Sequence, residues 1–208
     1  MNDPTDWTAV IERAFFTRLQ ELQNTDYIND SVRHQLAELG SVIDPLVTNP
    51  MDAANARFTA LAVAAYNVLE PLRGPAEAAA IVQDCLNSPL RPDILAGTRG
   101  MLDQSGDPFA ALVAVSKERE ETYFGPSFRF ERPVDDHDTY VLDVRRCFFH
   151  DVLTAAGFPE LQAILCRFDL NWADAIDPAQ HHTRFVRPVT FASGTTCRML
   201  FTREERIG

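Results

Sequence analysis

The chain has 208 residues, of which 46% are hydrophobic and 24% are charged, and its formal net charge is −11. This composition is that of a globular protein long enough to bury a core without disulfide bonds. The acidic charge argues against nucleic acid as a partner, because phosphate binding needs a clustered surface of Lys and Arg.

The N-terminal segment MNDPTDWTAVIERAFFTRL carries acidic residues before its apolar stretch, which is unlike a signal peptide. The sequence contains no uncharged run of about 18 residues that would predict a membrane span. We therefore expect a cytoplasmic protein without a membrane partner. The four cysteines are then expected to be reduced thiols unless they bind metal or take part in chemistry.

The first part of the chain, residues 1–122, has the apolar spacing of helices. The run KEREETY near its end is typical of a solvated helix face. The helices that the pattern predicts cover residues 6–23, 30–47, 52–72, 74–87 and 107–124.

The second part, residues 123–208, begins with a period-two alternation that is typical of half-buried strands. The predicted order is two strands over 124–134 and 139–147, two helices over 148–157 and 158–176, and two strands over 183–194 and 195–204. This order predicts an α+β fold. In it, an N-terminal helical bundle packs on a β-β-α-α-β-β unit with a small antiparallel sheet and two helices on one face. We expect the two parts to form one compact unit.

Cys147 lies where a predicted strand turns into a helix, in the segment RRCFFHDVL. A helix N-terminus lowers the pKa of a thiol, because the unpaired N–H groups favour the thiolate. His150, three residues on, can share a helix face with Cys147, and Asp151 can cap the helix or orient the imidazole. A Cys/His pair with a carboxylate is the minimal set for nucleophilic catalysis. Core packing is the alternative, because free cysteine is among the most buried residue types.

Cys166 and Asp169 repeat this i, i+3 spacing in the next predicted helix. A buried Asp169 would need a partner such as Arg184 or Arg187, whereas a solvent-facing Asp169 would need none.

Cys197 lies on the last predicted strand, far along the chain from the other thiols. Together with Cys147, Cys166 and His150 it would complete a Cys₃His zinc set. Against this, the sequence has no CxxC pair, so a bound metal stays an alternative to a site without a cofactor.

The segments YFGPSFRFE, RRCFFHDVLTAAGFPEL, LCRFD and TFASGTTCRMLFTR together resemble the L-2-amino-thiazoline-4-carboxylic acid hydrolase family, over about residues 105–205. The resemblance rests on an ordered set: a Cys with a nearby His, a Gly-x-Pro-Glu-Leu turn, a Cys-x-x-Asp and a Gly-x-x-Cys. Two positions depart from the family pattern. Phe148 follows the first cysteine where Pro is common, and Arg198 follows the last one where an acidic or small residue is common.

The resemblance implies a hydrolase acting on a cyclic carbon–nitrogen bond other than a peptide, on a small and anionic substrate. In the namesake reaction, a 2-aminothiazoline ring opens to a carbamoyl-cysteine. The corresponding hypothesis makes Cys147 the nucleophile, His150 the proton carrier and Asp169 the residue that holds the ring nitrogen or activates water. Arg184 or Arg187 would bind the substrate carboxylate. Cys166 and Cys197 would line the pocket or take the nucleophile role themselves.

Two other readings stay open for this sequence. One is a metal-binding protein and the other is a non-catalytic small-ligand-binding domain of the same fold. The oligomeric state is also left open, and a homo-oligomer is compatible with the sequence.

Overall fold

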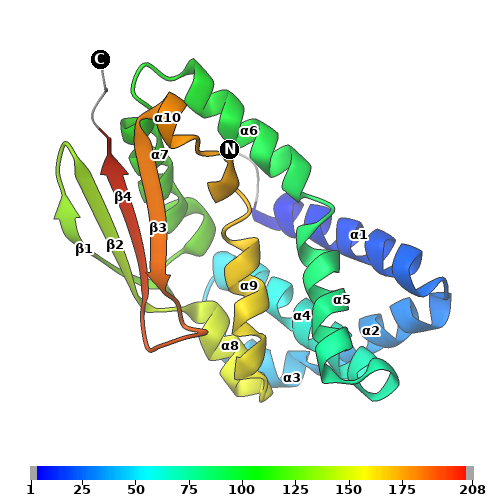
Figure 1. The fold of residues 1–208 in the computed structure, drawn as a ribbon. Helices are drawn as coiled ribbons and strands as arrows, with labels where there is room; N and C mark the ends of the chain where they lie inside the picture. Colours follow the sequence, from blue (N-terminus) through cyan, green and yellow to red (C-terminus); the bar gives the residue numbers. More distant parts are fainter. Residues whose placement is uncertain (1–3, 205–208) are drawn as a thin grey trace. The chain divides into compact units, whose positions relative to one another are not determined.

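The computed structural model describes residues 4–204, with side chains from residue 7 onward (Figure 1). The predicted α+β class is confirmed, because N-terminal helices precede a four-stranded antiparallel sheet with helices between its strand pairs. The chain's contacts group it into two units, each discontinuous in sequence: residues 1–90 with 148–168, and residues 91–147 with 169–208. The packing of the helical part on the sheet stays a prediction.

The first unit is helical. Its α-helices are α1 (Pro4–Gln23), α2 (Asp26–Glu38), α3 (Gly40–Ile43), α4 (Pro50–Arg73), α5 (Pro75–Asn87), α8 (Phe148–Ala156) and α9 (Gln162–Phe168). Short 3₁₀ turns, η1 (Asp44–Leu46) and η3 (Pro159–Leu161), precede α4 and α9.

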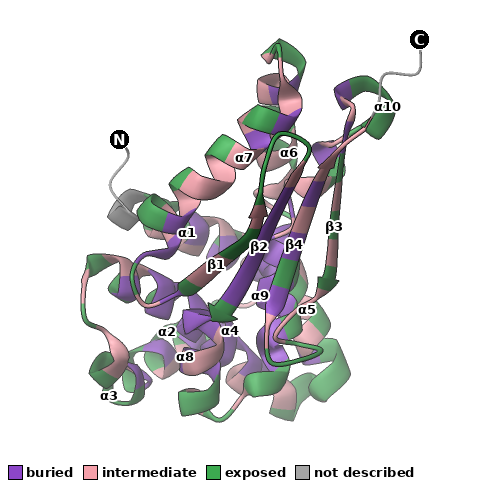
Figure 2. Cartoon of the chain, turned by 90° about the vertical axis from the view of Figure 1, so that its left-hand side faces the viewer, coloured by how far each residue is buried: buried purple, intermediate pink, exposed green. Residues whose placement is uncertain are grey.

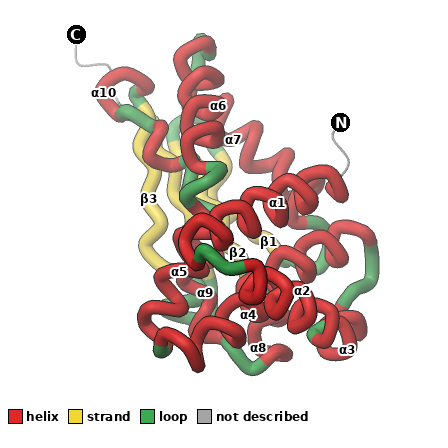
Figure 3. The backbone as a smooth tube through the Cα atoms, turned by 90° about the vertical axis from the view of Figure 1, so that its right-hand side faces the viewer, coloured by secondary structure: helices red, strands yellow, loops and turns green. Residues whose placement is uncertain are grey.

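Helix α4 is the centre of this unit, and it contacts α1, α2, α5 and α8 (Figure 3). Every residue from 58 to 66 is buried, so this part of the helix has no solvent-facing side. Five of these nine residues, in FTALAVAAY, are Ala or Thr, and small side chains let the neighbouring helices approach closely. Asn49 is the N-cap of this helix, and its side-chain oxygen accepts the N–H of Asp52.

The second unit contains the sheet and the segments around it. Its helices are α6 (Arg91–Gln104), α7 (Pro108–Arg119), the π-helical turn η2 (Glu120–Phe124), the 3₁₀ turn η4 (Ala173–Ala175) and α10 (Pro178–His181). Its strands are β1 (Arg129–Asp135), β2 (Thr139–Arg146), β3 (Thr183–Val189) and β4 (Cys197–Arg203), in the order β1-β2-β4-β3.

One face of the sheet, here called the inner face, carries large apolar side chains. Tyr140 on β2 lies opposite Phe201 on β4, which lies opposite Phe185 on β3, and Trp172 packs on the last two. On the other face, the buried carboxylate of Asp143 receives two hydrogen bonds from Arg198, of 2.6 and 2.7 Å. Strand β2 is therefore buried on both sides over residues 140–144, as the colouring of Figure 2 shows.

Some predicted elements differ from those in the structure. The helix expected over 107–124 is present as α7 and the π-helical turn η2, which ends at Phe124 as expected. The strand expected from residue 124 begins only at Arg129, because the chain leaves the helical path at Gly125, with φ 78°. The helix expected over 158–176 is formed only as far as Phe168, by η3 and α9, and the chain then continues as turns that include η4. Helix α6 was not predicted, because Leu102 is its one fully buried residue and so it has little apolar periodicity. No helix among the described residues is long and apolar enough to cross a membrane.

Candidate functional site

Cys197, Arg187 and Asp169 meet on the inner face of the sheet in the second unit. Arg187 donates from Nε to Cys197 Sγ at 3.1 Å, and its Nη1 lies 3.2 Å from Asp169 Oδ2. All three are nearly shielded from solvent, with 2% of Cys197, 8% of the Arg187 side chain and 9% of the Asp169 side chain exposed. A thiol that receives a guanidinium hydrogen bond is in the kind of electropositive site that favours the thiolate.

Arg119, the last residue of α7, completes this group. Its Nη2 donates to Asp169 Oδ1 at 3.1 Å, so the two oxygens of one carboxylate bind two guanidinium groups. Beside it, burial raises the pKa of Tyr123 to about 12, with the Arg119 charge opposing the rise and Asp169 adding to it. We call Arg119, Asp169, Arg187 and Cys197 the Asp169 cluster.

The local sequence explains how β3 and β4 place Arg187 and Cys197 together. The register of β3 shifts between Val186 and Val189, around Pro188, which has no N–H to donate. The turn that returns the chain to β4 contains Gly194, where a Cβ would lie 3.1 Å from Cγ2 of Val189. A residue without a side chain fits this close approach, which gives the Gly-x-x-Cys motif a packing reason.

Arg184 is not brought to this cluster. It precedes Arg187 by three residues on β3, so it projects from the opposite face of the strand. Its side chain is 60% exposed and donates from Nε to Glu204 at 2.6 Å.

His150 and Cys166 lie in the first unit, on either side of Gln162. Gln162 donates from Nε2 to Cys166 Sγ at 3.3 Å, and its Oε1 lies 3.3 Å from His150 Nδ1. The amide is 2% exposed, so α8 and α9 share a buried polar contact. Its donor to the sulfur is neutral, which is a weaker stabiliser of a thiolate than a guanidinium.

Cys147 is the last residue before α8 and is 8% exposed. Asp151 lies in the first turn of that helix, where a carboxylate interacts favourably with the helix dipole. The junction of strand and helix that the sequence predicted at Cys147 is confirmed.

The segment KEREETY was predicted to be a solvated helix face, and this was wrong at Glu120. Its side chain is 4% exposed, accepts the hydroxyl of Tyr140 at 3.0 Å and pairs with Arg132 at 2.5 Å. Burial is the largest influence on both acids: it raises the pKa of Glu120 and brings that of Tyr140 to about 12. Arg119 in the same segment was missed as a site residue, because the wide turn after it breaks helical periodicity.

Asn171 is a further residue that sequence reasoning missed. It follows Asp169 by two positions and is 2% exposed, and neither its side-chain oxygen nor its nitrogen has a hydrogen-bond partner within residues 4–204. Buried amides in proteins nearly always have partners, so this residue is an exception in the turn that carries Asp169.

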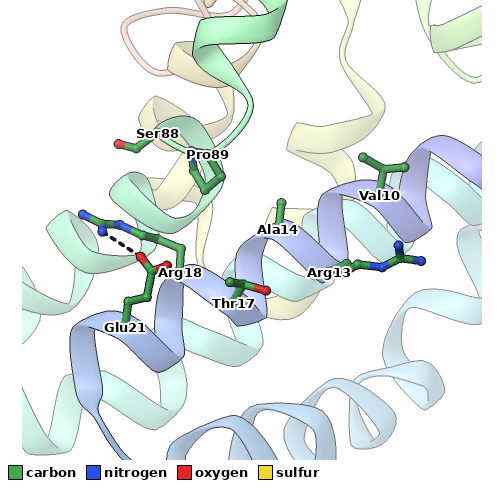
Figure 4. Close-up of a pocket in the computed structure, with 8 residues that line it drawn as sticks. All are labelled: Val10, Arg13, Ala14, Thr17, Arg18, Glu21, Ser88 and Pro89. Carbon is green, nitrogen blue, oxygen red and sulfur yellow. Dashed lines mark hydrogen bonds and ion pairs between the residues drawn. The ribbon is translucent and has the colours of Figure 1, made fainter.

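The part of the chain that the structure describes contains no group of three or more His, Cys, Asp or Glu side chains placed to hold a metal ion. A separate open groove of about 610 Å³ lies on the first unit, between α1 and the end of α5 (Figure 4). In it, Arg18 is held by Asp84 at 2.7 Å and Glu21 at 3.0 Å. The groove contains none of the sequence-predicted site residues.

The family model described as L-2-amino-thiazoline-4-carboxylic acid hydrolase matches residues 54–201, which include every sequence-predicted site residue. No curated protein and no solved structure gives a significant match. The match covers well over half of the chain, and the chain therefore belongs to the L-2-amino-thiazoline-4-carboxylic acid hydrolase family.

Proposed function

We propose that this chain is a thiol hydrolase that opens a small cyclic substrate at a carbon–nitrogen bond, with Cys197 as the nucleophile. Membership of the family suggests a hydrolase, and the family name implies hydrolysis of a carbon–nitrogen bond. The observation that carries the thiol mechanism is the 3.1 Å hydrogen bond from Arg187 Nε to Cys197 Sγ. A fixed guanidinium donor stabilises the thiolate, which is the nucleophilic form of cysteine.

The proposed reaction has two steps on one carbon. In the first, the Cys197 thiolate adds to the amidine carbon of an amino-thiazoline ring, the ring carbon–nitrogen bond breaks, and the leaving nitrogen takes a proton. In the second, water adds to the same carbon, the bond to Cys197 breaks and the thiolate is restored. The water molecule of the second step releases one proton, which replaces the proton that the leaving nitrogen took in the first step. The net change is therefore the addition of one water to give an open carbamoyl product.

Asp169 acts in this proposal as a positioning residue. It holds the Nη1 edge of Arg187, so the Nε–H of the same rigid guanidinium stays aimed at the sulfur. Burial of the group keeps bulk water away from these charges, which strengthens their interactions. Arg187 is thereby engaged with Asp169 and Cys197, and it is a stabiliser of the thiolate rather than a ligand of the substrate carboxylate.

Four single Cys→Ser variants test the nucleophile, at positions 147, 166, 197 and 85. With 2-aminothiazoline-4-carboxylate as substrate, we expect Cys197→Ser to lower kcat by about a thousandfold or more, as for removal of other nucleophiles. Cys85→Ser is the matched control for a buried thiol outside the cluster. Quenched turnover followed by peptide mass mapping should find the covalent intermediate on Cys197.

Three outcomes would contradict this proposal. If only Cys147→Ser abolishes turnover, the nucleophile is the residue that the sequence favoured first. Full activity in all four variants would contradict a thiol mechanism. Absence of turnover in the wild-type protein, across cyclic amidines with and without a carboxylate, would contradict the hydrolase itself.

A further inference from the structure

Arg119 has hydrogen-bonding capacity that the Asp169 cluster does not use. Its Nη2 binds Asp169, whereas neither Nε nor Nη1 donates to any group in the described part of the chain. Its side chain is 30% exposed, compared with 8% for Arg187. One edge of this guanidinium is therefore held inside the cluster, while its other donors remain available to a ligand.

The turn after α7 explains how Arg119 is held. Gly125 donates its N–H to the carbonyl of Glu120 at 3.1 Å, which is the i to i+5 bond of a π-helix. The guanidinium carbon lies over the rings of Tyr123 and Phe124, at 4.9 and 5.3 Å from their centroids. The contact between Arg119 and Phe124, five residues later, is a consequence of this wide turn. Such turns are frequent at functional sites, and ring contacts restrain the planar cation.

Arg119 is linked to the proposed nucleophile by a chain of polar contacts within the Asp169 cluster. Arg119 reaches Cys197 through Asp169 and Arg187, in three successive contacts of 3.1, 3.2 and 3.1 Å. A protonated amino-thiazoline ring that carries a carboxylate has a cationic amidine at one end and an anion at the other. A thiolate at Cys197 complements the first charge, and the unused edge of Arg119 complements the second.

We propose that Arg119 binds the carboxylate of the substrate and thereby sets the preference of the site for an anionic ring over a neutral one. This inference rests on the proposed function of Cys197. It assigns the carboxylate to a residue on α7, whereas the sequence favoured Arg184 or Arg187 on the strand. A planar guanidinium suits this role because it offers two parallel N–H donors to a carboxylate.

Calorimetric titration with two inert probes tests the assignment without turnover. Thiazolidine-4-carboxylate carries the anion, and thiazolidine-4-carboxamide has the same ring without the charge. We expect the wild-type protein to prefer the carboxylate, and Arg119→Met to weaken its binding about 10- to 100-fold while leaving the carboxamide unchanged. Arg119→Lys, which keeps the charge and the pairing with Asp169, is the second variant if Arg119→Met folds poorly, and its expected loss is smaller.

Arg184→Met separates this assignment from the one that the sequence favoured, and it is expected to leave the preference unchanged. If Arg184→Met removes the preference for the carboxylate and the Arg119 variants do not, the inference is overturned. It is also overturned if the wild-type protein shows no preference, or if the preference survives in both Arg119 variants.

Alkylation of Cys197 separates a failure of this inference from a failure of the proposed function. Iodoacetate carries a carboxylate and iodoacetamide does not, so a bound carboxylate should make Cys197 react relatively faster with iodoacetate. Cys197 could react with both reagents while Arg119→Met leaves the ratio of the two rates unchanged. That result contradicts the role of Arg119, but it does not contradict Cys197 as the nucleophile. An inert Cys197 contradicts the nucleophile, and the titrations still decide the role of Arg119.

Discussion

Two cysteines in this protein are equally buried and differ in what surrounds their sulfur. Cys85 on α5 is 1% exposed, and Cys197 on β4 is 2% exposed. Burial, with a smaller contribution from the neighbouring Asp84, raises the pKa of Cys85 to about 12. Cys197 instead accepts a hydrogen bond from Arg187. Burial alone therefore does not decide whether a thiol is inert or chemically useful, because the partner of the sulfur decides it.

The largest effect should come from removing the carboxylate that holds the Asp169 cluster together. Asp169→Asn leaves Arg119 and the buried Arg187 without their anion, and breaking a buried ion pair costs about 3–5 kcal/mol. We expect a loss of this size in the free energy of unfolding, measured by urea denaturation at pH 7.

Asp107→Asn is the matched control for that variant. Asp107 binds Arg203 through two contacts of 2.9 and 3.0 Å, but its side chain is 43% exposed. Asparagine keeps the N-cap, and exposed pairs contribute about 1 kcal/mol or less. Equal losses in the two variants would show that burial of the Asp169 cluster has no energetic consequence.

A smaller effect, on catalysis, should follow from removing the donor to Cys197. We expect Arg187→Met to lower kcat/KM about 100-fold, which is typical for the loss of one fixed donor to a developing or reactive anion. The pH at which Cys197 becomes half-alkylated should rise in the same variant, toward the behaviour of Cys85.

Arg145→Met is the control for Arg187→Met. Arg145 lies on β2, donates from Nε to Glu131 at 2.7 Å and is 41% exposed, so its loss should leave kcat/KM within about twofold of the wild type. An unchanged alkylation profile in Arg187→Met would mean that the guanidinium does not set the state of the sulfur.

The smallest effect concerns the pH dependence of stability at Cys85. A free thiol has a pKa of about 8.5, whereas burial raises that of Cys85 to about 12, so the unfolded state loses its proton first. The contribution to stability is fully present below about pH 8.5 and is lost as the pH rises toward 12. The difference between wild type and Cys85→Ala should therefore change by up to about 1.4 kcal/mol per pH unit across this range.

Urea denaturation of both proteins at intervals from pH 7 to 10.5 measures this difference, and the contributions of other titrating groups cancel in the subtraction. A difference that stays constant with pH would mean that the Cys85 thiol ionises as easily in the folded as in the unfolded state.

The sequence predicted the fold class and the strand order along the chain, because both depend on periodicity. Apolar residues at helical spacing in the first half and alternation over residues 139–147 need no knowledge of distant contacts. It also predicted that Asp169, if buried, would need a basic partner, and Arg187 is such a partner. The junction of strand and helix at Cys147 was also predicted, because the change from strand to helix periodicity is a local pattern.

Helix α6 and the turn η2 were beyond reach of such patterns. Helix α6 buries little apolar surface, and η2 departs from the 3.6-residue period on which helix prediction depends. The role of Arg119 was missed as a result, since it sits at the residue where the regular helix ends.

The sequence by itself determined the four strands and most of the helices. It also determined that the cysteines lack the local spacing of a metal site and that the chain carries the motifs of its family. Only the tertiary structure decided that Cys197 receives the guanidinium of Arg187 and that one carboxylate joins Arg187 to Arg119. Arg119 and Asp169 are 50 residues apart in the chain. Contacts of this kind depend on how separate elements pack, and a pattern of neighbouring residues carries no information about them.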